Sequence, residues 1–143
     1  MSDSSDIDNA LIAKLAADAT LLSLCPNGVY WDEAPPLPPA STRFVIVSMV
    51  DETDEPMLGA RAFETSLYLV KAVMLSTAAS AGDIKAAAAR IDVLLDQQPL
   101  TVSGYGVSLM RRDSRVRMTE VDEFDKSIRW FHRGGRYLVV ASS

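Results

Sequence analysis

The sequence predicts a two-layer α+β domain with a mainly antiparallel β-sheet of about four long strands and two α-helices packed on one face. The basis is two segments with helical spacing and two pairs of strand-like segments joined by short turns. Strands joined in this way usually pair antiparallel. Two amphipathic helices can then cover one face of the sheet. The length of 143 residues fits a single domain, 1–143, in which we expect residues 1–5 to be flexible.

The first helix is predicted from Ser4 or Ser5, either of which can cap it, to about Leu24. Its apolar positions recur every three or four residues, which is the helical period: Ile7, Leu11, Leu15, Ala19 and Leu22. We expect it to stop there because Pro26 disfavours helical geometry at Cys25. The short segment 29–31 should be extended, and residues 34–39, with four prolines, should form a stiff connecting loop.

The first pair of long strands is predicted at 44–50 and 62–74. The former is β-branched and almost wholly apolar, and the latter alternates between two faces. Between them, residues 51–59 are predicted to be a loop because they contain four acids, a proline and a glycine. Met57 and Leu58 place an apolar pair at its tip, which either contacts a partner or folds back onto the domain.

The C-terminal half repeats this order loosely. A helix is predicted between Ser80, its expected cap, and Pro99, followed by a short strand at 100–102. Residues 107–121 form a strand whose apolar parity shifts, which predicts a bulge at 111–114. In the last strand, 127–140, Gly134 and Gly135 indicate either a bulge, which we favour, or a hairpin turn.

Composition excludes several classes of protein. Apolar residues make up 48% and charged residues 23%, an ordinary globular mix. No run approaches the roughly 20 apolar residues of a membrane span, and the acidic N-terminus lacks the positive start of a signal peptide. We therefore expect a soluble intracellular product. One cysteine cannot form an internal disulfide, and one histidine cannot complete a zinc site with it.

The net charge of −5 is unevenly distributed. Residues 1–106 hold 6 basic and 14 acidic residues, and residues 107–143 hold 8 basic and 5 acidic ones. Such asymmetry can mark a nucleic-acid site, but arginines that alternate along strands are more often a solvated strand face. A DNA-binding domain would more often have a pI above about 9, and the pI of this chain is about 4.8.

No catalytic signature is present: the sequence has no G-x-S-x-G, phosphate-binding glycine loop or H-E-x-x-H. Cys25 and His132 could form a thiol–imidazole pair, although structural roles are the simpler interpretation. The acids of the 51–55 segment could hold calcium, but their spacing lacks the pattern of a dedicated calcium loop. We expect no catalytic residue, no metal and no cofactor.

Three stretches together resemble the siphophage tail terminator, or tail completion, proteins. They are the helix at 10–19 with its continuation to Tyr30, the proline-rich connection 35–39 leading into strand 44–47, and the last strand, 129–140. The resemblance covers nearly the whole chain and consists mostly of packing and turn residues.

The resemblance implies a small α+β subunit without catalytic residues that assembles as a ring, typically a homohexamer. Such a ring caps the tail tube and joins it to the head connector or stopper protein, in the virion neck, after assembly in the host cytoplasm. The implied partners are further copies of the chain, the tail tube protein and the connector. DNA would pass only in transit, through an acidic lumen that avoids trapping phosphates, and no membrane is involved.

We expect the subunit or partner interface to use the acidic segment, the apolar pair beside it and the C-terminal arginines. These candidates are Asp51, Glu52, Asp54, Glu55, Met57, Leu58, Arg111, Arg112, Arg115, Arg117, Arg133 and Arg136. Three alternatives stay open: another neck component such as a head-completion or stopper protein, a small enzyme or ligand-binding module, and a nucleic-acid-binding protein using the arginines.

Overall fold

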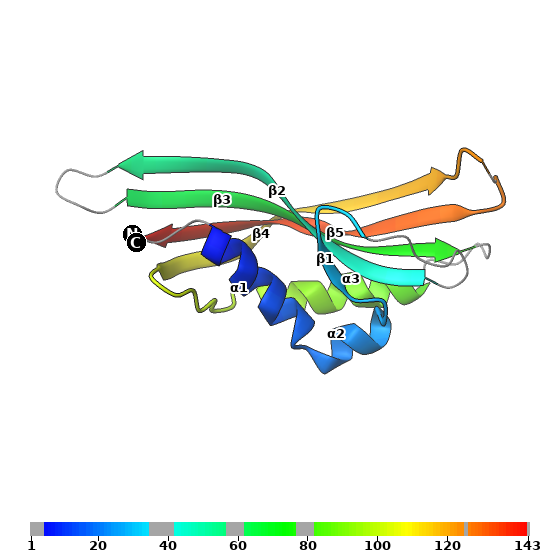
Figure 1. Ribbon diagram of the computed structural model, residues 1–143, viewed down its shortest axis with the longest axis horizontal. Helices are drawn as coiled ribbons and strands as arrows, with labels where there is room; N and C mark the ends of the chain where they lie inside the picture. The colour runs from blue at the N-terminus through cyan, green and yellow to red at the C-terminus, as the bar shows by residue number, and fades with distance from the viewer. Residues whose placement is uncertain (1–4, 35–41, 57–61, 77–81, 125, 143) are drawn as a thin grey trace.

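The computed structural model describes residues 5–34, 42–56, 62–76, 82–124 and 126–142. A five-stranded sheet has the strand order β1-β2-β3-β5-β4. Its strands are β1 (Val29–Trp31), β2 (Thr42–Pro56), β3 (Ala62–Ser76), β4 (Gly106–Val121) and β5 (Arg129–Ser142). The helices are α1 (Ser5–Ala16), α2 (Ala19–Leu24) and α3 (Gly82–Leu95). All three helices lie on one side of the sheet (Figure 1).

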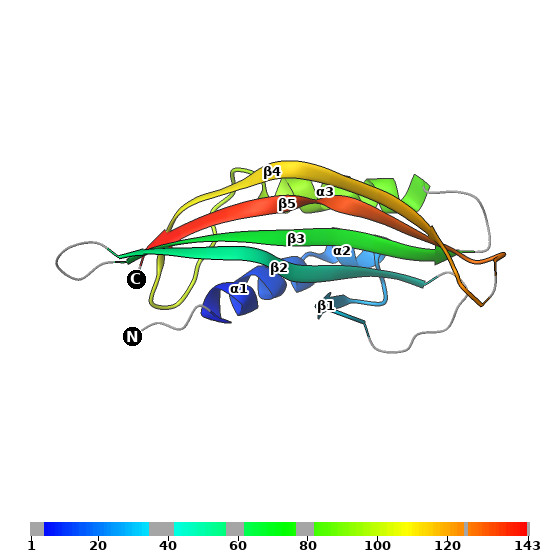
Figure 2. The same cartoon turned by 90° about the horizontal axis from the view of Figure 1, so that it is seen from above.

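The predicted α+β class and the four long antiparallel strands are confirmed. β2 pairs with β3, β3 with β5 and β5 with β4, all antiparallel. The short strand β1 adds the one parallel pairing of the described sheet, along β2 from Val45 to Val47. Figure 2 shows the four long strands side by side, with β1 beside only part of β2.

The N-terminal helix is two helices where the sequence predicted one. Asp18 has extended backbone angles and its side chain accepts a hydrogen bond from the Leu21 N–H, so it caps α2. A cap of this kind satisfies an otherwise unpaired amide at a helix start. The break at Asp18 lets the helix turn while Leu11, Leu15 and Leu21 all stay buried.

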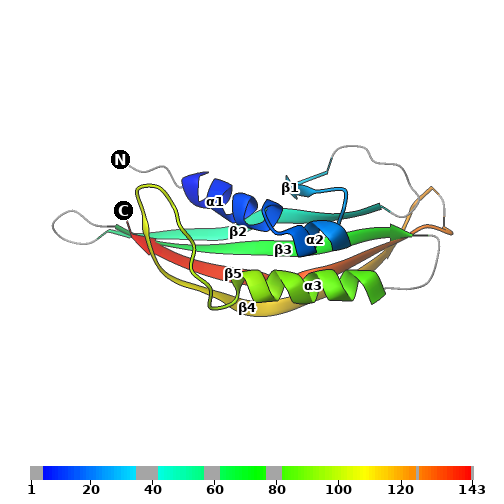
Figure 3. The same ribbon diagram turned by 90° about the horizontal axis from the view of Figure 1, so that it is seen from below.

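The main core lies between the helices and the sheet. It takes the inward residues of α1 and α3 together with every second residue of the long strands, such as Val70, Val139 and Ala141. We call this side the helix-covered face; α1 lies over β2 and β3, and α3 over β5 and β4 (Figure 3). Burying these side chains supplies the hydrophobic stabilisation of the two-layer arrangement.

The opposite side, here called the open face, carries a second and smaller apolar cluster. Phe44, Ile46 and Val73 are buried there, and Tyr30 and Trp130 pack against them. Phe44 meets both aromatic rings edge to face. This cluster explains why residues 44–47 of β2 are buried on both faces, as their continuous apolar pattern predicted.

The predicted loop at 51–59 is wrong over its first part, because β2 continues to Pro56. Residues 51–56 pair with 62–67 of β3 after a register shift between Met49 and Asp51. Backbone pairing along a hairpin outweighs the low strand propensity of acidic residues here, and Pro56 stands at the strand end, where proline is tolerated. Met57 and Leu58 lie outside the described residues, as do Ser80 and the prolines at 35–39.

Two further expectations need correction. Residues 100–102 form only an isolated bridge, between Val102 and Tyr105. The glycine pair at 134–135 makes neither a bulge nor a turn, because β5 runs through it in unbroken register with β3. The predicted bulge near 111–114 is confirmed in β4, where the register shifts between Arg112 and Ser114.

The glycines serve close strand packing instead. A Cβ atom at Gly134 would stand 2.0 Å from the Val70 carbonyl oxygen, and one at Gly135 would stand 2.8 Å from the Ser114 carbonyl oxygen. Neither separation is compatible with a side chain. β5 therefore approaches both of its neighbours at the level of the β4 bulge.

Candidate functional site

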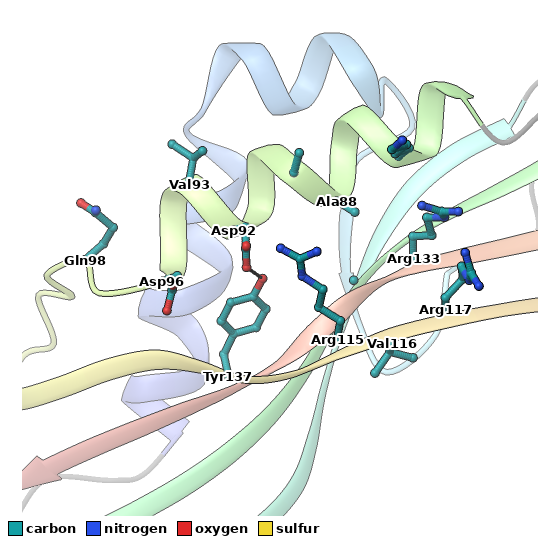
Figure 4. A pocket seen from close by; sticks show the side chains of 13 residues that line it. Ala88, Asp92, Val93, Asp96, Gln98, Arg115, Val116, Arg117, Arg133 and Tyr137 are labelled. Atoms are coloured by element: carbon teal, nitrogen blue, oxygen red, sulfur yellow. Dashed lines mark hydrogen bonds between the residues drawn. The ribbon is translucent and has the colours of Figure 1, made fainter.

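A groove of about 750 Å³ lies between α3 and the strands β4 and β5. One wall is the outer side of α3, including Lys85 and Ala88, and the other wall comes from β4 and β5. Figure 4 shows Arg115, Arg117 and Arg133 on the strand side of this groove. Three of the arginines that the sequence singled out thus share one cavity.

The bulge in β4 decides which arginines face the groove. Arg112 lies opposite Tyr137 in the β4–β5 register, and after the shift Arg115 lies opposite Gly135 and Arg117 opposite Arg133. Strand residues alternate between faces, so two residues three positions apart normally lie on opposite faces. Without the bulge, Arg112 and Arg115 would therefore lie on opposite faces of the sheet. The extra residue puts all three on the helix-covered face.

At one end of the groove, charges are neutralised within the chain. Tyr137 donates a hydrogen bond of 2.6 Å to Asp92, and the Arg112 guanidinium forms an ion pair with the same carboxylate. Asp96 accepts a 2.8 Å hydrogen bond from the Arg112 backbone N–H. Burial, and then the hydrogen bond to Asp92, raises the pKa of Tyr137. This network attaches α3 to β4 and β5, so Arg112 has a structural partner.

At the other end, positive charge is uncompensated. Within the described ranges, no ion pair is formed by Arg115, Arg117, Arg133 or Lys85. Arg117 and Arg133 are also direct cross-strand neighbours. Like charges placed directly opposite on a sheet repel each other. This end of the groove therefore favours an anionic occupant.

Arg111 and Arg136 lie apart from this set. Arg111 occupies a position on the open face opposite Leu138 and forms a long ion pair of 3.8 Å with Asp113. Arg136, opposite Ser114, is exposed on the same open face. The candidate arginines are thus divided between the two faces of the sheet.

The four candidate acids stand at the opposite edge of the sheet from the arginines. Asp51, Glu52, Asp54 and Glu55 all belong to β2, which β3 and β5 separate from β4. Three strand spacings correspond to about 14 Å. Asp51 is exposed and Glu52 is half-buried. Pairing between these acids and the groove arginines therefore requires two copies of the chain.

Cys25 and His132 do not come together. Cys25 is buried in the main core, and burial raises the pKa of its thiol to about 11. His132 lies on the open face opposite Val73, where burial first and the charge of Lys71 second lower its pKa. Its Nε2 atom is 3.5 Å from Glu120. The sheet separates the two residues, so they form no nucleophile–base pair.

Sequence reasoning missed the α3 side of the groove. Asp92 and Asp96 are one helical turn apart, next to the apolar stripe of α3. This spacing puts both carboxyl groups on the same side of the helix, and it was the feature of the sequence that could have indicated the α3 wall. In the part of the chain that the structure describes, no three metal-binding side chains gather. No helix there has the length and apolarity needed to cross a membrane.

The fold is shared with solved structures. One is a protein in the virion of a native gene transfer agent particle, with 22% identity, a TM-score of 0.61 and coverage of 96% of each chain. A second solved structure has 14% identity, a TM-score of 0.57 and coverage of 97% of this chain and 96% of the other. No protein-family model and no curated protein sequence matches the chain.

Proposed function

We propose that this chain is a structural protein of a phage-like virion and that its role is that of a ring-forming tail terminator. The observation that carries the proposal is the end-to-end likeness of its fold to a chain of a gene transfer agent virion. The likeness spans 96% of both chains, so it involves the whole domain described above and not a single motif.

The surfaces of the molecule support assembly into a ring. The outer edge of β4 has no strand partner in the described sheet, and β1 covers β2 only from Val45 to Val47. Unpaired strand edges are templates for pairing with another chain. When the two edges differ, association is head-to-tail, and it closes into a ring if the rotation between copies allows.

In this role the ring, proposed to be a hexamer, would cap the tail tube and contact the head connector or stopper protein. The excess of acidic residues suits a channel through which DNA passes without being held. The role is architectural and requires no catalytic step and no cofactor. The location would be the neck of the virion, reached after assembly in the host cytoplasm.

The test is inactivation of the gene in the phage-like element that encodes it, followed by electron microscopy of the particles. Loss of a terminator should leave free heads and unattached tails of irregular length, and the wild-type gene should restore joined particles. Tails of normal length beside heads that leak DNA would instead indicate a head-completion or stopper protein. Normal, joined particles would contradict a role in the virion neck.

A further inference from the structure

The two free edges of the sheet carry opposite charge on the same face. Past Val47, β2 has an uncovered outer edge whose residues 51–55 include four acids. The outer edge of β4 carries Arg111, Arg112, Arg115 and Arg117 within seven residues. One copy of the chain therefore presents an acidic edge and a basic edge at the two sides of one sheet.

Strand directions match across these edges. β2, β3, β5 and β4 alternate in direction, so β4 runs opposite to β2. A second copy added in the same orientation would place its β2 antiparallel to the first copy's β4. Each long pairing in the described sheet has this geometry, and antiparallel pairing aligns side chains directly across the strands.

The register positions of the acids also belong to the matching face. The shift after Met49 brings Glu52 opposite Ser66, and Asp54 occupies the register position opposite Glu64. Both positions share the helix-covered face with Arg115 and Arg117. Within one sheet Glu52 is level with Met110, through Ser66 and Val139. A second copy displaced along the strands by about six register positions would place its acids beside the uncompensated end of the groove, where Arg117 and Arg133 repel each other.

We infer that residues 51–55 of β2 in one copy pair edge to edge with residues 111–117 of β4 in the next. The acids at register positions 52 and 54 then stand beside the groove and offset most of the charge of Arg115, Arg117 and Arg133. The occupant of the groove is thus a second copy of this chain. The inference adds a specific contact to the proposed ring, and it rests on that proposal for the closed symmetry. The strand pairing between two copies can be measured without it.

The test exchanges charges between the two edges. The groove variant is Arg115→Glu with Arg117→Glu, and the strand variant is Glu52→Lys with Asp54→Lys. Each variant alone has two like-charged edges, so assembly should be lost. In an equimolar mixture, the unchanged acidic strand of the groove variant meets the unchanged basic groove of the strand variant. The two substituted edges, a strand with lysines and a groove with glutamates, also have opposite charge. The mixture should therefore assemble in alternation.

Sedimentation measures the outcome at ~20 mM and ~500 mM salt, because screening weakens exposed charge pairs. Wild-type protein should assemble at high protein concentration, more readily at low salt. Each variant should raise the concentration for half-assembly by about tenfold or more, since two favourable cross-strand pairs become repulsive. Circular dichroism checks that both variants are folded.

Two control variants change the net charge by the same amount elsewhere. They are Lys14→Glu with Lys126→Glu, and Glu33→Lys with Glu123→Lys. Both should assemble like wild type. Equal loss of assembly in the controls would show that net charge, and not the two edges, governs association, and would overturn the inference.

Three other results would overturn it: wild-type protein that is monomeric at every concentration and salt tested, a mixture no larger than its components, or a groove that binds duplex DNA. The last would appear as salt-sensitive DNA retention lost in the groove variant while assembly persists. None of these would disturb the particle phenotype that tests the proposed function, so the two can fail separately.

Discussion

Tyr68 and Tyr137 lie directly opposite each other on adjacent strands and connect the sheet to two different helices. The Tyr68 hydroxyl donates a 2.5 Å hydrogen bond to Asp8 of α1, and the Tyr137 hydroxyl donates a 2.6 Å hydrogen bond to Asp92 of α3. Burial is the first cause of the raised pKa of both phenols. The pair fixes both helices, and hence the groove wall, to the centre of the sheet.

Replacing Tyr137 with phenylalanine should lower the free energy of unfolding by about 1–2 kcal/mol, because a hydrogen bond to a carboxylate is lost. Denaturant unfolding measures the change. Tyr68→Phe provides a matched comparison and should cost a similar amount. Because Asp92 also holds Arg112, assembly should weaken in Tyr137→Phe more than in Tyr68→Phe. Equal assembly in the two variants would argue against α3 as a wall of the interface.

Gly134→Ala should destabilise the fold by about 3 kcal/mol. The new Cβ would meet the Val70 carbonyl oxygen and the Lys71 Cα atom, and neither can move without breaking the β3–β5 ladder. Gly106→Ala is the control, because its nearest contacts would be at 3.9 Å. Thermal unfolding should separate the two variants clearly, and equal midpoints would refute the close approach.

Asp18 should make stability depend on pH in the acid range. The Arg90 side chain donates two hydrogen bonds to the Asp18 carboxylate, and with the Leu21 N–H it lowers the pKa of Asp18 from 3.8 to about 2. A carboxyl whose pKa is depressed by folding stabilises the protein above its unfolded pKa, and this contribution is lost as pH falls toward the folded value.

Asp18→Asn should therefore remove the part of the stability change that falls between about pH 4 and pH 2. At neutral pH, Asp18→Ala should cost about 1 kcal/mol through loss of the α2 cap. Urea unfolding at a series of pH values measures both effects. A pH profile of Asp18→Asn identical to that of wild type would show that another carboxyl carries the acid dependence.

Arg117→Gln should act in opposite directions on the single chain and on the assembly. It removes the repulsion between Arg117 and Arg133, so the free energy of unfolding should rise by about 0.2–1 kcal/mol. Assembly should weaken because one partner of the acidic strand is lost. Unfolding at low protein concentration and sedimentation at high concentration measure the two effects. A less stable monomer would indicate a favourable contact of Arg117 within the chain.

Local patterns in the sequence were sufficient for most of the architecture. Helical spacing located α1 and α3, and alternation in residues 62–74 indicated that β3 is a strand with two distinct faces. The shifted parity of residues 107–121 located the bulge in β4. Each of these signals depends on neighbouring residues alone, so it can be seen without knowing the rest of the fold.

The errors share a physical cause. Residues 51–56 contain loop-forming residues, but pairing with β3 holds them in a strand. Gly134 and Gly135 look like a break in the strand, but they are needed because β3 and β4 approach β5 closely from both sides. In both places pairing with another strand decides the local conformation.

The sequence by itself determined the α+β class, the four long strands and a charge division between an acidic N-terminal part and a basic C-terminal part. Only the tertiary structure decided where those charges stand. The strand order puts β2 and β4 at opposite edges, and the bulge turns Arg115 and Arg117 toward α3. Strand order and face depend on long-range pairing, which composition and periodicity do not encode.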